Sequence, residues 1–167
     1  DNREKIIAQA SQMQDIFSKI NQRSAVLNQP LLPFVDKIIS YLDEEYGSFK
    51  GAPKFPQFYL FDAMFYFYLK TNDEKYLKPV ETLLKNICSK GIYDQLAGGI
   101  ARYTVDDKWI IPHFEKMLYD NIQFISLLSK FYQSTKSDYF KSKLIQTIKY
   151  INTEFVNDIG LYGSAYD

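Results

Sequence analysis

The pattern of apolar positions predicts helices along most of the chain, with breaks at Pro and Gly clusters, and no segment shows the alternation of a half-buried strand. Residues 3–27 form a mostly polar predicted helix with a sparse apolar stripe, which ends at Asn28-Gln29-Pro30. Further helices are predicted over residues 31–45, 57–70, 73–90, 112–134 and 137–156. The fold class that this pattern predicts is all-α.

Successive helices after residue 31 alternate in character. Helices 31–45, 73–90 and 137–156 are apolar on one face, which indicates that they cover a core from outside. Helices 57–70 and 112–134 are apolar around most of their circumference, so we expect other helices to enclose them. Tyr76 and Tyr139 follow the two inner helices in similar segments and lie 63 residues apart, which indicates a repeated helical hairpin.

Hairpins of this kind cannot bury their inner faces alone and stack around an axis, as in an α/α toroid. We expect residues 1–29 to form a connector helix and residues 30–167 to form a partial toroid of about two and a half helical hairpins. The chain begins Asp-Asn-Arg-Glu-Lys, which is typical of a fragment or a processed chain. A partial ring cannot enclose a substrate, so we expect the isolated chain to be inactive and its open face to favour a homodimer.

Composition and charge argue against several function classes. The chain has 20 basic and 20 acidic residues and a net charge of zero, which is unlike a nucleic-acid-binding protein. Its most apolar stretch, residues 58–69, contains Asp62 and is too short to cross a membrane. One cysteine, Cys88, and one histidine cannot build a usual metal site, and no cofactor is expected. A cytoplasmic location is the default for a chain without cysteine pairs.

The only histidine lies in the stretch PHFEKMLYDN, residues 112–121. Pro112 suits the first position of a helix, and a helix that begins there places His113 and Asp120 on one stripe near its N-terminal end. We expect the long loops 47–56 and 91–111 to gather at the same end. His113 is then a candidate general acid or base, because its unperturbed pKa lies near neutrality, and Asp120 would orient it.

Other polar and aromatic residues of the loops are candidates for the same site. These are Asp94 as a partner of His113, and Arg102, Tyr103, Trp109, Lys54 and Glu115 as substrate contacts. Most of the 14 Tyr and 13 Phe residues are expected in the core, which leaves Tyr93, Tyr103 and Trp109 as stacking candidates. The alternatives are that Lys54 is solvated at the surface, that Glu115 complements the helix dipole, and that His113 and Asp120 belong to a buried polar network.

Three motifs together carry a resemblance to a known family. They are GAPKFP at residues 51–56, GIYDQLAGGIARYTVDDKW at residues 91–109 and PHFEKMLYDN at residues 112–121. In this order they resemble the thioredoxin-domain-containing proteins of the YyaL type, whose animal relatives are called spermatogenesis-associated proteins. The resemblance covers about residues 30–160. The chain departs from the family pattern at Ala97, where the family has a third glycine, and it keeps only Asp167 of a later acidic pair.

The resemblance implies a fold and a class of function. Family members have a thioredoxin-like domain followed by an (α/α)6 toroid similar to N-acylglucosamine 2-epimerases and six-hairpin glycosidases, so this chain would be the opening part of the toroid. The implied function is binding or isomerisation of a carbohydrate or sugar phosphate. The alternative is a non-catalytic helical scaffold that binds a partner or the thioredoxin-like domain of the parent protein. Both alternatives rest on analogy between folds.

Overall fold

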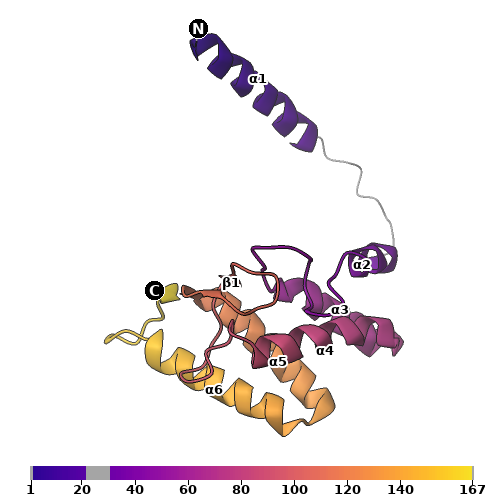
Figure 1. The fold of residues 1–167 in the computed structure, drawn as a ribbon, viewed down its shortest axis with the longest axis vertical. Coiled ribbons are helices and arrows are strands. Elements are labelled where there is room, and N and C mark those ends of the chain that lie inside the picture. The colour runs from indigo at the N-terminus through magenta and orange to yellow at the C-terminus, as the bar shows by residue number, and fades with distance from the viewer. Residues whose placement is uncertain (1, 22–30, 167) are drawn as a thin grey trace. The chain divides into compact units, whose positions relative to one another are not determined.

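A computed structural model describes residues 2–21 and 31–166, which fall into two compact units, residues 1–31 and 32–167. The first unit holds helix α1 (Asn2–Asn21), and the last part of the predicted connector, residues 22–29, lies outside the described residues. The second unit holds the other helices and four short strands (Figure 1). They are α2 (Leu31–Ile39, which begins at the boundary), α3 (Phe58–Thr71), α4 (Glu74–Ser89), β1 (Tyr103–Thr104), β2 (Pro112–His113), β3 (Lys116–Met117), α5 (Leu118–Thr135), α6 (Asp138–Glu154) and β4 (Ala165–Tyr166).

The helices of the second unit pack as two antiparallel hairpins. Helix α3 packs against α4, α5 packs against α6, and the inner helices α3 and α5 pack against each other (Figure 1). Apolar side chains from these helices meet in a main core, in which Phe61, Phe65, Leu83, Phe124 and Leu128 are almost completely buried. A second, smaller cluster of Tyr150, Ile151 and Phe155 lies at the end of α6. The all-α class and the order of outer and inner helices are therefore confirmed, although four strands of two residues each join the loops.

The inner helices leave one face uncovered. Tyr59, Tyr66 and Leu69 of α3 are more than half exposed, and they follow one another at helical spacing. Lys130 of α5 forms an ion pair with Asp62 of α3, with 2.6 Å between Nζ and Oδ1, on this open face. The prediction that other helices enclose the inner pair on every side is wrong here. In a complete toroid these side chains would line the central cavity. Apolar residues of an inner helix can therefore face this cavity instead of another helix.

Helix α5 begins at Leu118, so the prediction that a helix starts at Pro112 is wrong. The segment before Leu118 is extended because its backbone pairs with distant segments. Strand β2 pairs antiparallel with β1, with Tyr103 opposite His113, and β3 pairs antiparallel with β4. The Leu118 N–H donates to the carbonyl of Ser164 at 2.9 Å. Phe114, predicted to lie in the core, is 82% exposed as a consequence.

Helix α2 ends at Ile39, six residues before the predicted end. A turn replaces its last part, because the Asp43 carboxylate accepts hydrogen bonds from the backbone N–H groups of Glu45 and Tyr46, both at 3.0 Å. The Asp43 N–H donates to the carbonyl of Ser48, and Leu42 forms a β-bridge with Phe49. Aspartate commonly competes with helix formation in this way. The turn starts the loop that leads to α3.

The glycine-rich part of the long loop packs closely against the second hairpin. Gly99 has a φ of 78°, and a Cβ there would lie 2.7 Å from the Tyr150 ring. Asn121 of α5 fixes the next residue, because its side chain accepts from the Ile100 N–H at 2.8 Å and donates to the Ile100 carbonyl at 3.1 Å. Gly99 therefore allows close approach of the loop backbone to Tyr150.

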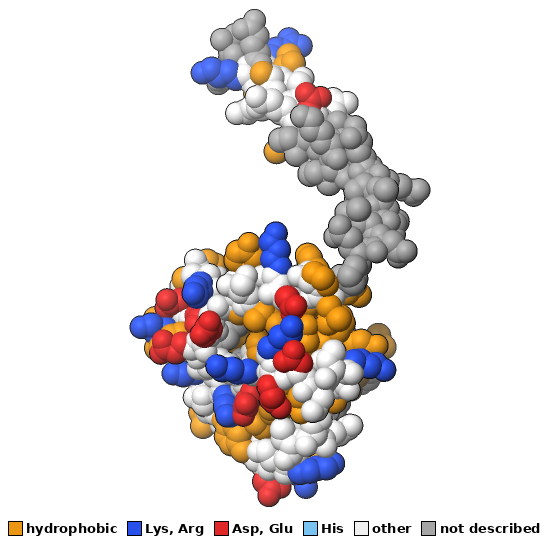
Figure 2. All heavy atoms as spheres, turned by 90° about the vertical axis from the view of Figure 1, so that its right-hand side faces the viewer, with side chains coloured by type: hydrophobic (Ala, Val, Ile, Leu, Met, Phe, Trp, Pro, Cys, Tyr) orange, Lys and Arg blue, Asp and Glu red, His pale blue; other side chains and the backbone are white. Residues whose placement is uncertain are grey.

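A helix that crosses a bilayer must be both long enough and apolar enough to span its hydrocarbon core. Among the described residues, none forms a helix that meets both requirements for a membrane span. On the face drawn in Figure 2, basic and acidic side chains are interspersed with hydrophobic ones, and neither sign of charge forms a continuous field.

Candidate functional site

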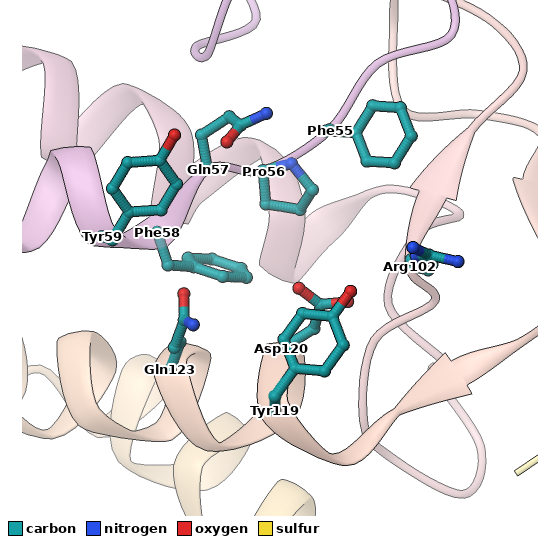
Figure 3. A pocket seen from close by; sticks show the side chains of 9 residues that line it. All are labelled: Phe55, Pro56, Gln57, Phe58, Tyr59, Arg102, Tyr119, Asp120 and Gln123. Carbon is teal, nitrogen blue, oxygen red and sulfur yellow. The ribbon is translucent and has the colours of Figure 1, made fainter. Parts of the chain in front are cut away.

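A cavity of about 260 Å³ opens where the loops before α3 and before α5 come together. It is lined by three residues before α3, two from its first turn, Arg102, and three residues from the first two turns of α5 (Figure 3). These residues are Phe55, Pro56, Gln57, Phe58, Tyr59, Arg102, Tyr119, Asp120 and Gln123. The cavity thus combines aromatic rings, two amides, one cation and one carboxyl group.

Backbone pairing brings the three segments together. Lys54 and Thr104 exchange both backbone hydrogen bonds, at 2.8 and 3.0 Å, which fixes the loop before α3 on strand β1. The Arg102 N–H donates to the carbonyl of Glu115 at 2.9 Å, which continues the β1–β2 ladder toward α5. The cavity walls are therefore attached to each other through the backbone before any ligand binds.

Asp120 has the most unusual electrostatic environment in the cavity. Burial raises the pKa of its carboxyl group to about 6, and the negative charge of Glu115 acts in the same direction. The positive charge of Arg102 and the hydroxyl of Tyr119 act against this rise without cancelling it. Its Oδ2 atom is buried and has no hydrogen-bond partner. Buried polar atoms are normally paired, so an unpaired oxygen beside a cavity is a site where a ligand can donate a hydrogen bond.

Arg102 supplies a positive charge at the same cavity. Its Nη1 atom lies 3.4 Å from Oε2 of Glu115, and the Arg102 side chain is 42% exposed. Arg102 also interacts with the hydroxyl group of Tyr119. Because the guanidinium group carries five N–H donors, the contacts with Glu115 and Tyr119 leave donors available for a ligand. Arg102, Glu115 and Asp120, all predicted site residues, are thus brought together in the structure.

His113 and Tyr103 lie beside this group but not within it. The His113 ring stacks on Tyr103 with 4.8 Å between centroids and an interplanar angle of 12°. Tyr103 stacks in turn on Phe55, which lines the cavity, with centroids 4.8 Å apart. His113 belongs to β2 and Asp120 to α5, so the premise that both lie on one helical stripe is wrong. A catalytic role for His113 stays a prediction.

Trp109 and Lys54 lie in the interior. Trp109 is 0% exposed, and its indole N–H donates to the carbonyl of Tyr46 at 2.7 Å. Lys54 is 1% exposed, and its ammonium group pairs with Asp43 at 2.9 Å and donates to the carbonyl of Phe49 at 2.7 Å. The predicted stacking surface at Trp109 and the expected solvation of Lys54 disagree with these positions. Both side chains hold the loop 42–56 in place.

Asp94 lies at a different cavity from Asp120. Its carboxylate accepts from the N–H groups of Leu96 and Ala97 and forms a 2.8 Å ion pair with Lys116. Burial raises the pKa of Asp94, but the bonds from Lys116 and the two amides outweigh burial and keep this pKa below its usual value. Asp94 and Lys116 both line this separate cavity, whose other residues are Gly91, Ile92, Ala101, Pro112 and Phe114. The structure therefore does not group Asp94 with Asp120.

Sequence reasoning missed most of the wall that α3 and α5 contribute. Gln57, Tyr59 and Gln123 were assigned to helices by their apolar neighbours, and nothing marked them as site residues. One sequence feature could have identified Gln123: it follows Asp120 by three residues, which places both side chains on one face of α5. Among the described residues, no group of three or more His, Cys, Asp or Glu side chains is placed to hold a metal ion.

The amino-acid sequence is similar to longer animal proteins. The chain is 33% identical over 129 residues to spermatogenesis-associated protein 20 of Rattus norvegicus, and equally identical to its counterpart from Homo sapiens. It is also 33% identical over 131 residues to an uncharacterized protein of Caenorhabditis elegans, B0495.5. These matches cover 75% of the chain but only 16% to 18% of each relative. A scan against protein-family models gave no match.

The fold is similar to that of sugar epimerases of known structure. A sugar epimerase from a ruminal bacterium aligns with a TM-score of 0.66 at 19% identity, over 91% of the chain and 40% of the epimerase. Cellobiose 2-epimerase from Spirochaeta thermophila aligns with a TM-score of 0.66 at 16% identity, over 93% of the chain and 40% of the enzyme. The chain therefore has the fold of part of an (α/α)6 toroid, and its sequence relatives are spermatogenesis-associated proteins.

Proposed function

We propose that the cavity between the starts of α3 and α5 binds a sugar ring, and that Asp120 exchanges a proton with it in an epimerisation or isomerisation. We further propose that the chain belongs to the thioredoxin-domain-containing proteins of the YyaL type. The observation that carries the first proposal is the buried, unpaired Oδ2 atom of Asp120 in a cavity lined by aromatic and amide groups. The likeness to epimerase toroids supports the sugar class by analogy.

The chemistry assigned to Asp120 is proton transfer at a carbon next to a sugar carbonyl. The carboxylate takes the proton and becomes neutral, and the C–H electron pair forms an enolate with the carbonyl. Asp120 can return the proton on the same face to the neighbouring carbon, which isomerises the sugar. Epimerisation instead takes a proton from solvent on the other face of the first carbon, and Asp120 then releases its own proton to solvent. A pKa of about 6 suits this role, because efficient general bases have pKa values close to the working pH. The base is then ionised at pH 7 and still holds the proton long enough to return it.

Arg102 has a complementary role in this scheme. Its partly exposed guanidinium group lies at the same cavity as Asp120 and can donate hydrogen bonds to the oxygen that becomes negative in the enolate. The rings of Phe55 and Tyr59 offer apolar surface to the C–H face of a sugar. The amides of Gln57 and Gln123 supply donors and acceptors for its hydroxyl groups.

The test is hydrogen exchange at the sugar carbon next to the carbonyl, followed by NMR in D₂O with the full-length protein and a panel of neutral sugars. Asp120→Asn keeps the shape of the side chain and removes the base, so the exchange rate should fall by about 10²–10⁴-fold. Asp138→Asn is the matched control, because Asp138 lies in the first turn of α6 as Asp120 lies in that of α5.

The control variant should exchange at the wild-type rate. If Asp120→Asn also exchanges at that rate, Asp120 is not the base and the proposal fails. If Asp120→Asn instead unfolds at a lower denaturant concentration without any sugar turnover in the wild type, a non-catalytic scaffold is the better account.

A further inference from the structure

The cavity at Asp120 continues along the open face of the inner helices. A second cavity, of about 270 Å³, is lined by Phe58, Tyr59, Asp62, Gln123 and Ser126. It shares Phe58, Tyr59 and Gln123 with the first cavity, so the two adjoin along the line where α3 faces α5. Each cavity alone is smaller than the roughly 300 Å³ at which small-molecule sites begin, whereas the two together lie within the usual range.

The extent of this groove follows from the positions on α5. Asp120, Gln123 and Ser126 are spaced three residues apart and lie along one side of the helix. With a rise of about 1.5 Å per residue, Asp120 and Ser126 are separated by about 9 Å along the axis. A groove of this length accommodates two linked pyranose rings, with the first at Asp120 and the second beside Ser126.

The second part of the groove offers unused binding groups. The side chains of Gln123 and Ser126 form no hydrogen bond with another described residue, and Tyr59 is 60% exposed. Amide and hydroxyl groups bind sugar hydroxyls, and an exposed phenol ring presents a flat apolar face. This combination of groups fits a polyhydroxylated ring better than it fits an apolar ligand.

The charges at the far end favour an uncharged ligand. Asp62 and Lys130 are the charged groups there, and they neutralise each other through the 2.6 Å ion pair between the helices. Arg102, the cation at the other end, forms an ion pair with Glu115 and interacts electrostatically with Asp120. No described basic side chain that lines either cavity is left for a phosphate on the second ring.

We propose that the groove from Asp120 to Ser126 holds two linked, uncharged sugar units. Ser126 binds the second unit, and Tyr59 and Gln123, which line both cavities, contact the groove where the two units join. The substrate class is therefore a neutral disaccharide or the end of a longer oligosaccharide, and sugar phosphates are excluded. This proposal rests on the proposed function, because the first unit is the ring that reacts at Asp120.

Isothermal titration calorimetry on the full-length protein tests the proposal. The probes are three pairs of neutral sugars: glucose and cellobiose, mannose and β-1,4-mannobiose, and N-acetylglucosamine and chitobiose, with glucose 6-phosphate as the charged probe. For the pair that binds, the disaccharide should bind at least tenfold more tightly than its monosaccharide. Glucose 6-phosphate should bind no more tightly than glucose.

Ser126→Leu locates the second unit, because the larger side chain fills the second cavity without touching the first. This variant should bind the disaccharide no more tightly than the monosaccharide. Its affinity for the monosaccharide should stay within about twofold of the wild-type value. Ser134→Leu is the control, since Ser134 is exposed on the same helix and lines neither cavity.

The possible results separate this proposal from the proposed function. The proposed position of the second sugar unit would be contradicted if each monosaccharide and its disaccharide bind equally tightly, or if the disaccharide keeps its advantage in Ser126→Leu. A sugar site at Asp120 would still stand in either case. Tighter binding of glucose 6-phosphate would overturn the uncharged class. Absence of binding for every probe would overturn both proposals.

Discussion

Two partly buried carboxyl groups, Asp43 in the loop after α2 and Asp120 in the first turn of α5, have opposite electrostatic environments. Burial raises the pKa of Asp43, but bonds from Tyr46 N–H and the Lys54 ammonium group outweigh burial and hold this pKa below its usual value. Burial raises the pKa of Asp120 to about 6, because too few donors oppose it. The comparison teaches that a carboxyl group with all its partners maintains structure, whereas one with an unpaired oxygen beside a cavity is available for a ligand.

The strongest test of the structural half of this comparison is Lys54→Met. It removes the cation but keeps most of the side-chain volume, which leaves Asp43 and the Phe49 carbonyl without their donor. We expect the free energy of unfolding to fall by about 3 kcal/mol, as for a broken buried ion pair. Urea unfolding measures this loss. Lys75→Met, at an exposed ion pair with Asp36, should change the urea midpoint little, and an equal loss in both variants would contradict the assignment.

The close packing behind the cavity is tested by Gly99→Ala. The new Cβ would meet the Tyr150 ring at 2.7 Å, and the backbone has a positive φ, so we expect a loss of about 2 kcal/mol in the free energy of unfolding. Gly160→Ala separates the two causes, because Gly160 has a φ of 80° with no atom within 4 Å. Its loss, from backbone strain alone, should be about 1 kcal/mol. Equal losses would show that the contact with Tyr150 contributes nothing.

The raised pKa of Asp120 predicts that its contribution to the free energy of unfolding depends on pH. The folded-state pKa of Asp120, about 6, exceeds its ordinary value of 3.8, so the folded protein binds this proton more tightly than the unfolded chain. The stabilisation from Asp120 is therefore complete below pH 4 and is lost as the pH rises through about 6. The loss is on the order of 1–2 kcal/mol, less than the full pKa shift implies, because the side chain is partly exposed and solvent screens its charge. The difference in unfolding free energy between wild type and Asp120→Asn should show this fall. A difference that does not change between pH 4 and 6 would contradict the raised pKa.

The smallest expected effect belongs to His113→Ala. His113 is exposed and contacts the cavity only through the rings of Tyr103 and Phe55. We expect the free energy of unfolding to change by about 0.5 kcal/mol or less, and sugar hydrogen exchange to fall by less than tenfold. A fall of more than a hundredfold with unchanged stability would restore His113 as the acid or base and contradict the role of Asp120.

The fold could be predicted from sequence to the extent that local patterns determine it. The apolar stripes of α4 and α6 and the apolar circumference of α3 gave the correct order of outer and inner helices, because these features depend on residues close in the chain. Pro112 gave a false helix start, because the backbone at residues 112–117 is paired with residues 103–104 and 165–166. Long-range pairing of this kind leaves no periodic signal in a segment of six residues.

Only part of the candidate site could be predicted from sequence, because residue type and motif indicate chemistry but not burial. Arg102, Glu115 and Asp120 were identified by residue type and by motif, and the structure places them together. Trp109 and Lys54 were assigned to the site because rings and cations in loops often bind ligands, yet the loops here fold over them. Burial of a loop side chain depends on tertiary packing, which residue type alone does not reveal.

The fold holds Asp120 about half protonated at pH 6, beside a cavity that supplies no partner for its Oδ2 atom. A ¹³C NMR titration of the Asp120 side-chain carboxyl carbon, assigned by its loss in Asp120→Asn, measures this directly. The account predicts a midpoint at about pH 6. A midpoint near 4, the value of an ordinary aspartate, would contradict it.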